Sequence, residues 1–195
     1  EIELGPRAHG RAQAHADNSE MKPSGFEVLD LRVRLAELIR VEGDRKREAT
    51  AAAEAMAVAF RAYEGDGTRF IVDPDTHPQT IGVLRTRAKP LGIQIDITAM
   101  PKNLPDGCFG SLISYPGSSG HLRDIAADID VTHAGGGMAI VCCDLLALTL
   151  LTSPGELGAD MAIGSAQRFG VPFGYGGPHA AFFATHQRLQ RAIPG

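Results

Sequence analysis

The sequence has few cysteines and no long apolar run, and each shortage excludes a class of protein. Its three cysteines, Cys108, Cys142 and Cys143, are too few and too badly spaced for a disulfide framework, which favours a reducing compartment. The longest apolar candidate, residues 138–151, is interrupted by Asp144 and falls short of the roughly 20 residues that cross a membrane. We therefore expect neither a disulfide-stabilised domain nor a membrane protein.

The chain also lacks a basic surplus, since its formal net charge is -4. Arginines are dense in the first 50 residues, but the balance gives no broad positive face, so we expect no nucleic-acid partner. With 195 residues and 44% hydrophobic content, the chain is long enough for one core or for a piece of a larger domain. It begins at Glu1 without a signal peptide and stops just after a helix-like segment, which we interpret as a fragment or truncated product.

The first 47 residues differ in character from the rest. Residues 1–25 mix Gly, Pro, His and Arg without a periodic apolar pattern, which predicts a mobile tail. Apolar residues recur at helical spacing over residues 27–41, which predicts one amphipathic helix. The charge run from Gly43 to Glu48 fits either a solvated turn or helix start, or a specific anion site. We expect residues 1–47 to form a divergent, partly disordered N-terminal segment.

From Arg47 onward, helical and strand patterns alternate. An alanine-rich helix comes first, and a second begins near Thr76 with Pro78 in its first turn. Further helices are predicted around residues 121–129 and 145–151. Six strands are predicted, at residues 69–73, 93–97, 110–114, 138–143, 161–164 and 180–184. This alternation predicts an α/β fold with a mostly parallel sheet and flanking helices.

In such sheets ligands bind where parallel strands end, so the residues that leave each strand are the first candidates for a site. Gly117 to Gly120 follows a strand with small residues and backbone N–H groups, which fits either a phosphate cradle or a plain turn. Asp144 ends an apolar strand, where its carboxylate either meets a cation such as a protonated pyridine nitrogen or caps the next helix. His77 is more typical of a satisfied helix-start residue than of a catalyst.

The most informative stretch runs from Gly164 to Ala184, where glycines and prolines surround Gln, Arg, Tyr and His before an apolar run. Such a loop holds polar groups at set positions beside a rigid strand. Arg168 could clamp a carboxylate or phosphate through two hydrogen bonds, and His179 could move a proton near neutral pH. Taken alone, each of these residues fits a structural role equally well.

Four segments stand out together: Glu48-Ala49-Thr50-Ala51-Ala52-Ala53-Glu54-Ala55-Met56, His77-Pro78-Gln79-Thr80, Gly158-Ala159-Asp160 and Gly164 to Ala184. They resemble the glycine decarboxylase, or P-protein, family of the glycine cleavage system. The last segment is long and idiosyncratic, so it carries most of the resemblance, which covers residues 48–195. The resemblance implies a fold-type I pyridoxal-phosphate (PLP) enzyme, of which residues 48–195 form an incomplete large domain.

The resemblance also implies an activity and partners. Family members are built from two similar halves or two subunits, and the lysine that holds PLP belongs to the second. As glycine dehydrogenases (aminomethyl-transferring), they form an imine between glycine and the cofactor, release carbon dioxide, and pass the aminomethyl group to the lipoyl arm of H-protein. The chain resembles the first half. Its implied partners are therefore the catalytic half or subunit 2, lipoylated H-protein and glycine.

The lysines agree with that placement. The sequence has four: Lys22, Lys46, Lys89 and Lys102. None lies between Asp144 and the C-terminus, where a Schiff-base lysine follows the Asp strand in this fold. Gln167 stands roughly at that position and cannot form an imine. We expect no catalytic residue, no metal site and no covalently held cofactor on this chain, which alone should be inactive.

Six residues are candidates for shaping a shared or vestigial site: Thr50, Asp144, Gln167, Arg168, Tyr175 and His179. Two functional hypotheses remain open. In the first, the chain is the non-catalytic half and associates tightly with a lysine-bearing half. In the second, it is a remnant or binding module that keeps the scaffold without the activity. An independent nucleotide-binding domain is a weaker idea, because G-x-G-x-x-G is absent.

Two places depart from the family pattern. Where the family has a Ser-Leu-Leu-Asp-Glu-like lead into the first helix, this chain has Asp44-Arg45-Lys46-Arg47-Glu48. Three glycines at residues 135–137 most simply predict a flexible connection. The family's location would be the cytoplasm in a bacterium and the mitochondrial matrix in a eukaryote.

Overall fold

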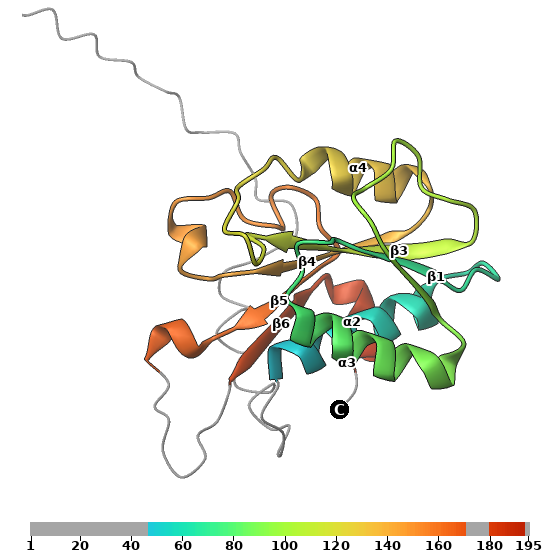
Figure 1. Ribbon diagram of the computed structural model, residues 1–195, viewed down its shortest axis with the longest axis horizontal. Coiled ribbons are helices and arrows are strands. Elements are labelled where there is room, and N and C mark those ends of the chain that lie inside the picture. The colour runs from blue at the N-terminus through green and yellow to red at the C-terminus, as the bar shows by residue number, and fades with distance from the viewer. Residues whose placement is uncertain (1–46, 171–179, 194–195) are drawn as a thin grey trace, which may run out of the picture.

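The computed structural model describes residues 47–170 and 180–193 (Figure 1). The predicted tail, the predicted helix at residues 27–41 and most of the charge run lie outside these residues. The division of the chain at residue 47 stays a prediction. The described residues contain the alternating helices and strands from which the candidate site is built.

The first described helix, α2, spans Arg47–Ala62 and is rich in alanine, the residue with the highest helix propensity. Glu48 in its first turn and Arg61 in its last turn complement the helix dipole. Along its inner face Met56 and Ala59 are fully buried. The small alanine side chains let this helix lie close against the sheet, and its first turn reaches the sheet edge where the strands end.

Six strands form one sheet in the order β2-β1-β3-β4-β5-β6. They are β1 Arg69–Val72, β2 Gln94–Ile97, β3 Cys108–Tyr115, β4 Met138–Cys143, β5 Met161–Ser165 and β6 Ala181–Thr185. Neighbouring strands are parallel except β5 and β6, which are antiparallel. The six predicted strands and the mostly parallel sheet are confirmed. From β1 the chain passes to β2 on one side of β1, and then to β3 on the other side of β1. Sheets of α/β proteins bind ligands at such a reversal of strand order.

Helices cover both faces of the sheet, as Figure 1 shows. The helix α3, Pro78–Ala88, and the short η4, Gln187–Ala192, share one face with α2, whereas α4, Ala126–Ala134, covers the other. Each face buries its own apolar core, the first centred on Phe109 and the second containing Ile129. In this three-layer arrangement the helices cover the two faces of the sheet, and loops occupy the edge at which the parallel strands end.

Two helix predictions were wrong in extent. The helix predicted around residues 121–129 begins only at Ala126, whose N–H donates to the Asp124 carboxylate at 3.0 Å. The helix predicted at residues 145–151 is a single 3-10 turn, η2, at Ala147–Thr149. There the Thr149 hydroxyl donates to the Leu146 carbonyl, a local bond that competes with helix continuation.

Two of the three glycines predicted to make a flexible connection at residues 135–137 instead lie tightly against Leu104. A Cβ on Gly135 would lie 2.4 Å from the Cβ of Leu104, and one on Gly137 would lie 2.9 Å from its Cδ2. Gly136 has a φ of 76°, which other residues rarely adopt. The link therefore needs glycine at residues 135 and 137 for close approach to Leu104, and at residue 136 for its positive φ, rather than for mobility.

Candidate functional site

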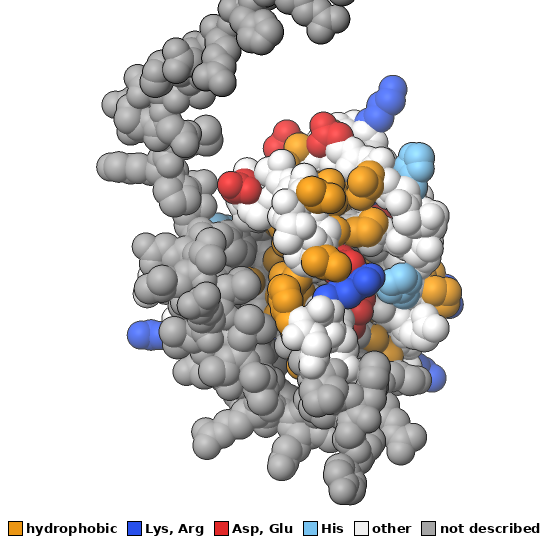
Figure 2. Space-filling model, turned by 90° about the vertical axis from the view of Figure 1, so that its left-hand side faces the viewer, with side chains coloured by type: hydrophobic (Ala, Val, Ile, Leu, Met, Phe, Trp, Pro, Cys, Tyr) orange, Lys and Arg blue, Asp and Glu red, His pale blue; other side chains and the backbone are white. Residues whose placement is uncertain are grey.

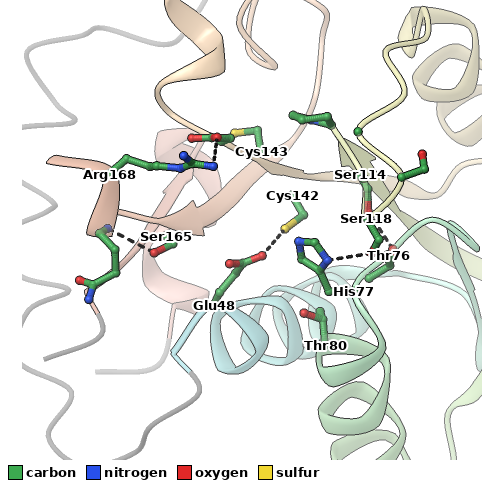
Figure 3. Close-up of a pocket in the computed structure, with 16 residues that line it drawn as sticks. Glu48, Thr76, His77, Thr80, Ser114, Ser118, Cys142, Cys143, Ser165 and Arg168 are labelled. Carbon is green, nitrogen blue, oxygen red and sulfur yellow. Dashed lines mark hydrogen bonds and ion pairs between the residues drawn. The ribbon is translucent and has the colours of Figure 1, made fainter. Parts of the chain in front are cut away.

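A pocket of about 420 Å³ lies where the parallel strands end. Its lining comes from the first turn of α2 and from the segments that follow β1, β3, β4 and β5, as Figure 3 shows. The polar and ionisable lining residues are Glu48, Thr76, His77, Thr80, Ser114, Ser118, Ser119, Cys142, Cys143, Asp144, Ser165, Gln167 and Arg168. Three of the six predicted site residues, Asp144, Gln167 and Arg168, therefore line one pocket at the strand ends, and their functional role stays a prediction.

The loop from Gly117 to Gly120 borders the pocket but does not form a phosphate cradle. Its N–H groups already have acceptors: Ser118 N–H donates to the Asp75 carbonyl at 2.8 Å, and Ser119 N–H to the Asp75 carboxylate at 2.9 Å. The Ser119 hydrogen bonds lower the pKa of Asp75 below its ordinary value, which keeps a negative charge beside the loop. Because Asp75 already accepts these hydrogen bonds, the donors are not available to a bound anion. Of the two alternatives, the structure therefore supports the plain turn.

His77 holds the start of α3 against the same loop. It immediately precedes Pro78, the first residue of the helix, and its Nδ1 lies 2.7 Å from the Ser118 hydroxyl. Beneath it the hydroxyls of Thr76 and Ser114 are buried and lie 2.9 Å apart. These bonds tie the end of β1 to the end of β3, as expected for a satisfied helix-start residue.

The Asp144 carboxylate contacts both a cation and a backbone N–H of the segment that follows it, which are the two kinds of partner considered from the sequence. Its Oδ2 forms an ion pair with a guanidinium nitrogen of Arg168 at 3.0 Å, and its Oδ1 accepts the Leu146 N–H at 3.0 Å. The carboxylate at the end of β4 is thus compensated by a cation from η3, Gln167–Phe169, and by a local turn. Its two bonds fasten the segment after β4 to the segment after β5.

Gln167 begins η3 two positions after the end of β5, and only some of the hydrogen-bonding groups of its side chain have partners among the described residues. Its Oε1 accepts the Ala180 N–H at 3.4 Å. Its Nε2 is buried without a hydrogen-bond partner among the residues that the structure describes. A buried amide donor without an acceptor is costly, which makes this atom a candidate contact for a ligand.

The other predicted site residues do not join this group. Thr50 lies in α2, two positions after Glu48, and is not part of the described pocket lining. Tyr175 and His179 lie outside the described residues. Roles for these three residues stay predictions.

Glu48 is the lining residue that sequence reasoning did not select. It lies in the first turn of α2 and its Oε1 accepts a hydrogen bond from the Cys142 thiol at 3.3 Å (Figure 3). No basic side chain of the described residues pairs with it. The sequence contained one signal for it, because Glu48 was the single residue of the charge run that kept the family pattern.

The two pocket cysteines are buried thiols. They are neighbours on β4 but enter the two different apolar cores, so their side chains point to opposite faces of the sheet. Burial raises the pKa of Cys143 to about 12, with the nearby Asp144 adding to the effect. Burial, followed by the nearby Glu48 charge, raises the pKa of Cys142 well above its ordinary value. A raised pKa keeps each thiol protonated at neutral pH.

We expect the native chain to react with iodoacetamide at pH 8 at least about a hundredfold more slowly than the urea-unfolded chain, because the thiolate is the nucleophile. A pKa near 12 leaves roughly one thiol in ten thousand ionised at pH 8. Mass spectrometry of the alkylated chain measures this, with all three cysteines labelled after unfolding as the control. Rapid labelling of native Cys142 or Cys143 at pH 8 would contradict the assignment.

Two kinds of site find no support in the described part of the chain. No group of three or more His, Cys, Asp or Glu side chains there is placed to hold a metal ion. Within the same residues no helix is long and apolar enough to cross a membrane. The polar lining of the pocket consists of hydroxyl, carboxylate, amide, guanidinium, imidazole and thiol groups.

Comparison with solved structures places this fold among PLP-dependent enzymes. The chain is similar to a crystal structure of glycine decarboxylase (P-protein) of the glycine cleavage system in inhibitor-bound form. The match has a TM-score of 0.72 and 29% identity over 86% of this chain and 40% of that one. A cysteine desulfurase from Escherichia coli matches with a TM-score of 0.57 at 17% identity, over 85% of this chain and 44% of that one, which supports the fold alone. The predicted fold-type I architecture is confirmed.

Sequence comparison gives the family. Glycine dehydrogenase (decarboxylating) from Rhodopseudomonas palustris is 61% identical over 149 residues, and that from Bradyrhizobium diazoefficiens is 58% identical over 149 residues. Each match covers 76% of this chain, which spans only 16% of the length of each relative. The family model described as glycine cleavage system P-protein matches residues 45–195. The chain therefore belongs to the glycine cleavage system P-protein family.

Proposed function

We propose that this chain is part of a glycine dehydrogenase (decarboxylating), and specifically the part that lacks the PLP lysine. In the whole enzyme, glycine would be decarboxylated and its aminomethyl group passed to the lipoyl arm of H-protein. The observation that carries the assignment of the half is that a glutamine, Gln167, and not a lysine lines the pocket two positions after the end of β5. No lysine contributes to the described lining, and Lys89 lies in η1, Lys89–Leu91, between α3 and β2.

The donor set of the pocket does not fit PLP. The cofactor needs an amine to hold its aldehyde, donors for its phosphate and a free carboxylate for its pyridine nitrogen. Here the amine is absent from the described lining, the Gly117 to Gly120 donors bond to Asp75, and Asp144 is paired with Arg168. Glu48 adds a negative charge where the first helix begins. We therefore assign the cofactor to the other half of the enzyme.

This chain would then hold the catalytic half in shape and form part of a shared cleft. Its proposed partners are that lysine-bearing half and the lipoylated H-protein. Exposed apolar side chains beside the strand ends support a role in association, namely Leu146, Leu150 and Phe169, of which Leu150 is 90% exposed. Figure 2 shows hydrophobic side chains gathered on one face of the molecule around oppositely charged ones. The bacterial origin of the relatives favours the cytoplasmic location.

The proposal is tested with PLP and borohydride. We expect borohydride to trap PLP on a lysine-bearing partner half and not on this chain, and glycine-dependent carbon dioxide exchange to require both. Absorbance spectra and peptide mapping after reduction measure the first, and exchange of labelled bicarbonate into glycine measures the second. The partner half alone is the control.

Cofactor trapped on this chain alone would overturn the assignment of the non-catalytic half. Exchange that proceeds equally well without this chain would favour the second hypothesis, a remnant or binding module that retains the scaffold. Tight co-migration of the two halves on a sizing column supports the first hypothesis independently of activity.

A further inference from the structure

We propose that the pocket of this chain binds a small α-amino acid as its zwitterion, with the ammonium group on Glu48 and the carboxylate on the Gln167 and Arg168 side. The ligand is held without reacting, since no group in the described lining is placed to form a covalent bond with it. The choice of glycine as the first ligand rests on the proposed function. The pocket itself is defined by the described residues alone.

The Glu48 carboxylate supplies the cation-binding end. It lines the pocket at the first turn of α2, where negatively charged side chains are stabilised by the helix dipole. Its one hydrogen-bond donor among the described residues is the Cys142 thiol, which is a weak donor and stays protonated because its pKa is raised by burial. Among the described residues this half-buried carboxylate has only this partner, and an ammonium group would complete it by bringing a positive charge and three strong donors.

Gln167 and Arg168 supply the carboxylate-binding end. The Gln167 Nε2 is buried and has no partner among the described residues, so a ligand oxygen would satisfy it. One nitrogen of the Arg168 guanidinium pairs with Asp144, and the group has further N–H donors. The Arg168 side chain is 60% exposed, so a ligand can reach these donors. Figure 3 shows Glu48 entering from α2 and Arg168 from the opposite strand-end loop. One end of the pocket thus favours a positively charged group and the other end a carboxylate.

The charges of the lining select a zwitterion over other small ligands. Glu48 and Asp144 bring two negative charges against the single positive charge of Arg168, which opposes phosphates and dicarboxylates. A simple amine satisfies Glu48 but leaves the Gln167 amide without an acceptor. The volume of about 420 Å³ lies at the small end of the range for ligand sites. A monocarboxylic α-amino acid is the class that satisfies both ends.

Calorimetric titration of the purified 195-residue chain with glycine tests this directly. We expect Glu48→Gln to weaken glycine binding at least about tenfold, because it removes a charge-assisted contact. Glu54→Gln is the matched control: Glu54 lies on the same helix, pairs with Arg87 away from the pocket, and should leave glycine binding unchanged. Gln167→Leu, which keeps the approximate volume but removes the amide donor, should weaken glycine binding about threefold to tenfold. Circular dichroism checks that each variant is folded.

Competition on the wild-type chain separates the two ends without any substitution. Methylammonium should compete with glycine at higher concentration, and acetate or inorganic phosphate should compete more weakly still. The proposal is overturned if glycine gives no titration, if Glu48→Gln binds as well as Glu54→Gln, or if phosphate displaces glycine more readily than methylammonium does. The titration uses neither the partner half nor the cofactor, so its result does not depend on the carbon dioxide exchange experiment. Either proposal can therefore be overturned without overturning the other.

Discussion

Replacing Phe109 with alanine is expected to lower the free energy of unfolding by about 4 kcal/mol, as typical for a fully buried aromatic residue. Phe109 is completely buried in β3 under α2. Its ring stacks on Phe70 with centroids 5.1 Å apart and meets Phe60 at the same distance in a tilted arrangement. The substitution therefore removes both apolar burial and aromatic contacts, and it leaves a cavity between the helix and the sheet. The urea midpoint, at an unchanged slope, measures the loss.

The matched control is Phe169→Ala, the same chemical change at a side chain that is 64% exposed. It should change the free energy of unfolding by no more than about 0.5 kcal/mol, as most surface substitutions do. Equal losses in the two variants would show that Phe109 does not lie in a close-packed core.

Replacing Asp160 with alanine is the second large effect, an expected loss of about 3 kcal/mol, because it removes a buried carboxylate with several hydrogen bonds and leaves a buried backbone donor without an acceptor. The Asp160 side chain is 6% exposed and accepts hydrogen bonds from the Ala139 N–H at 3.0 Å and from Arg188 at 2.5 Å. His133 Nε2 of α4 lies 2.8 Å from the same carboxylate. One side chain thus joins α4, β4 and η4, and its removal leaves the Ala139 N–H buried without a partner.

Asp130→Ala provides the comparison, since Asp130 is an exposed residue of α4. We expect its free energy of unfolding to stay within about 0.5 kcal/mol of the wild-type value. An Asp160→Ala variant as stable as Asp130→Ala would mean that the carboxylate does not join these elements. The Arg188→Ala variant should lose less than Asp160→Ala, because the Arg188 side chain is 66% exposed.

The strands were predictable because each is a short apolar run bounded by turn residues, and such patterns depend on local sequence. The helix at residues 145–151 was not, because its leucines satisfy helical spacing while Asp144 and Thr149 bond to nearby backbone groups instead. Likewise the tight packing of Gly135 depends on Leu104, which is distant in the sequence. Local pattern determined the elements, and long-range contacts determined where some of them begin and end.

The same division holds for the site. Asp144, Gln167 and Arg168 follow strands of a parallel sheet, so the rule that ligands bind at strand ends was enough to bring them together. The Gly117 to Gly120 loop has the same sequence whether its donors are free or used, and only the position of Asp75 decides between them. Glu48 belonged to a charge run, and its place in the pocket depends on how α2 crosses the end of β4.

The face of the sheet beneath α2 has a consequence for the order in which the protein can be completed during synthesis. Helix α2 packs against β5, β6 and η4, and the Arg61 guanidinium reaches the Ala192 carbonyl at 2.7 Å across 131 positions of the chain. A nascent chain that has emerged from the ribosome only as far as residue 100 contains the helix but none of these partners. Until Leu189 emerges, the part of α2 that packs against these elements stays exposed to chaperones and to other nascent chains. The time needed for translation therefore limits how soon this core can form.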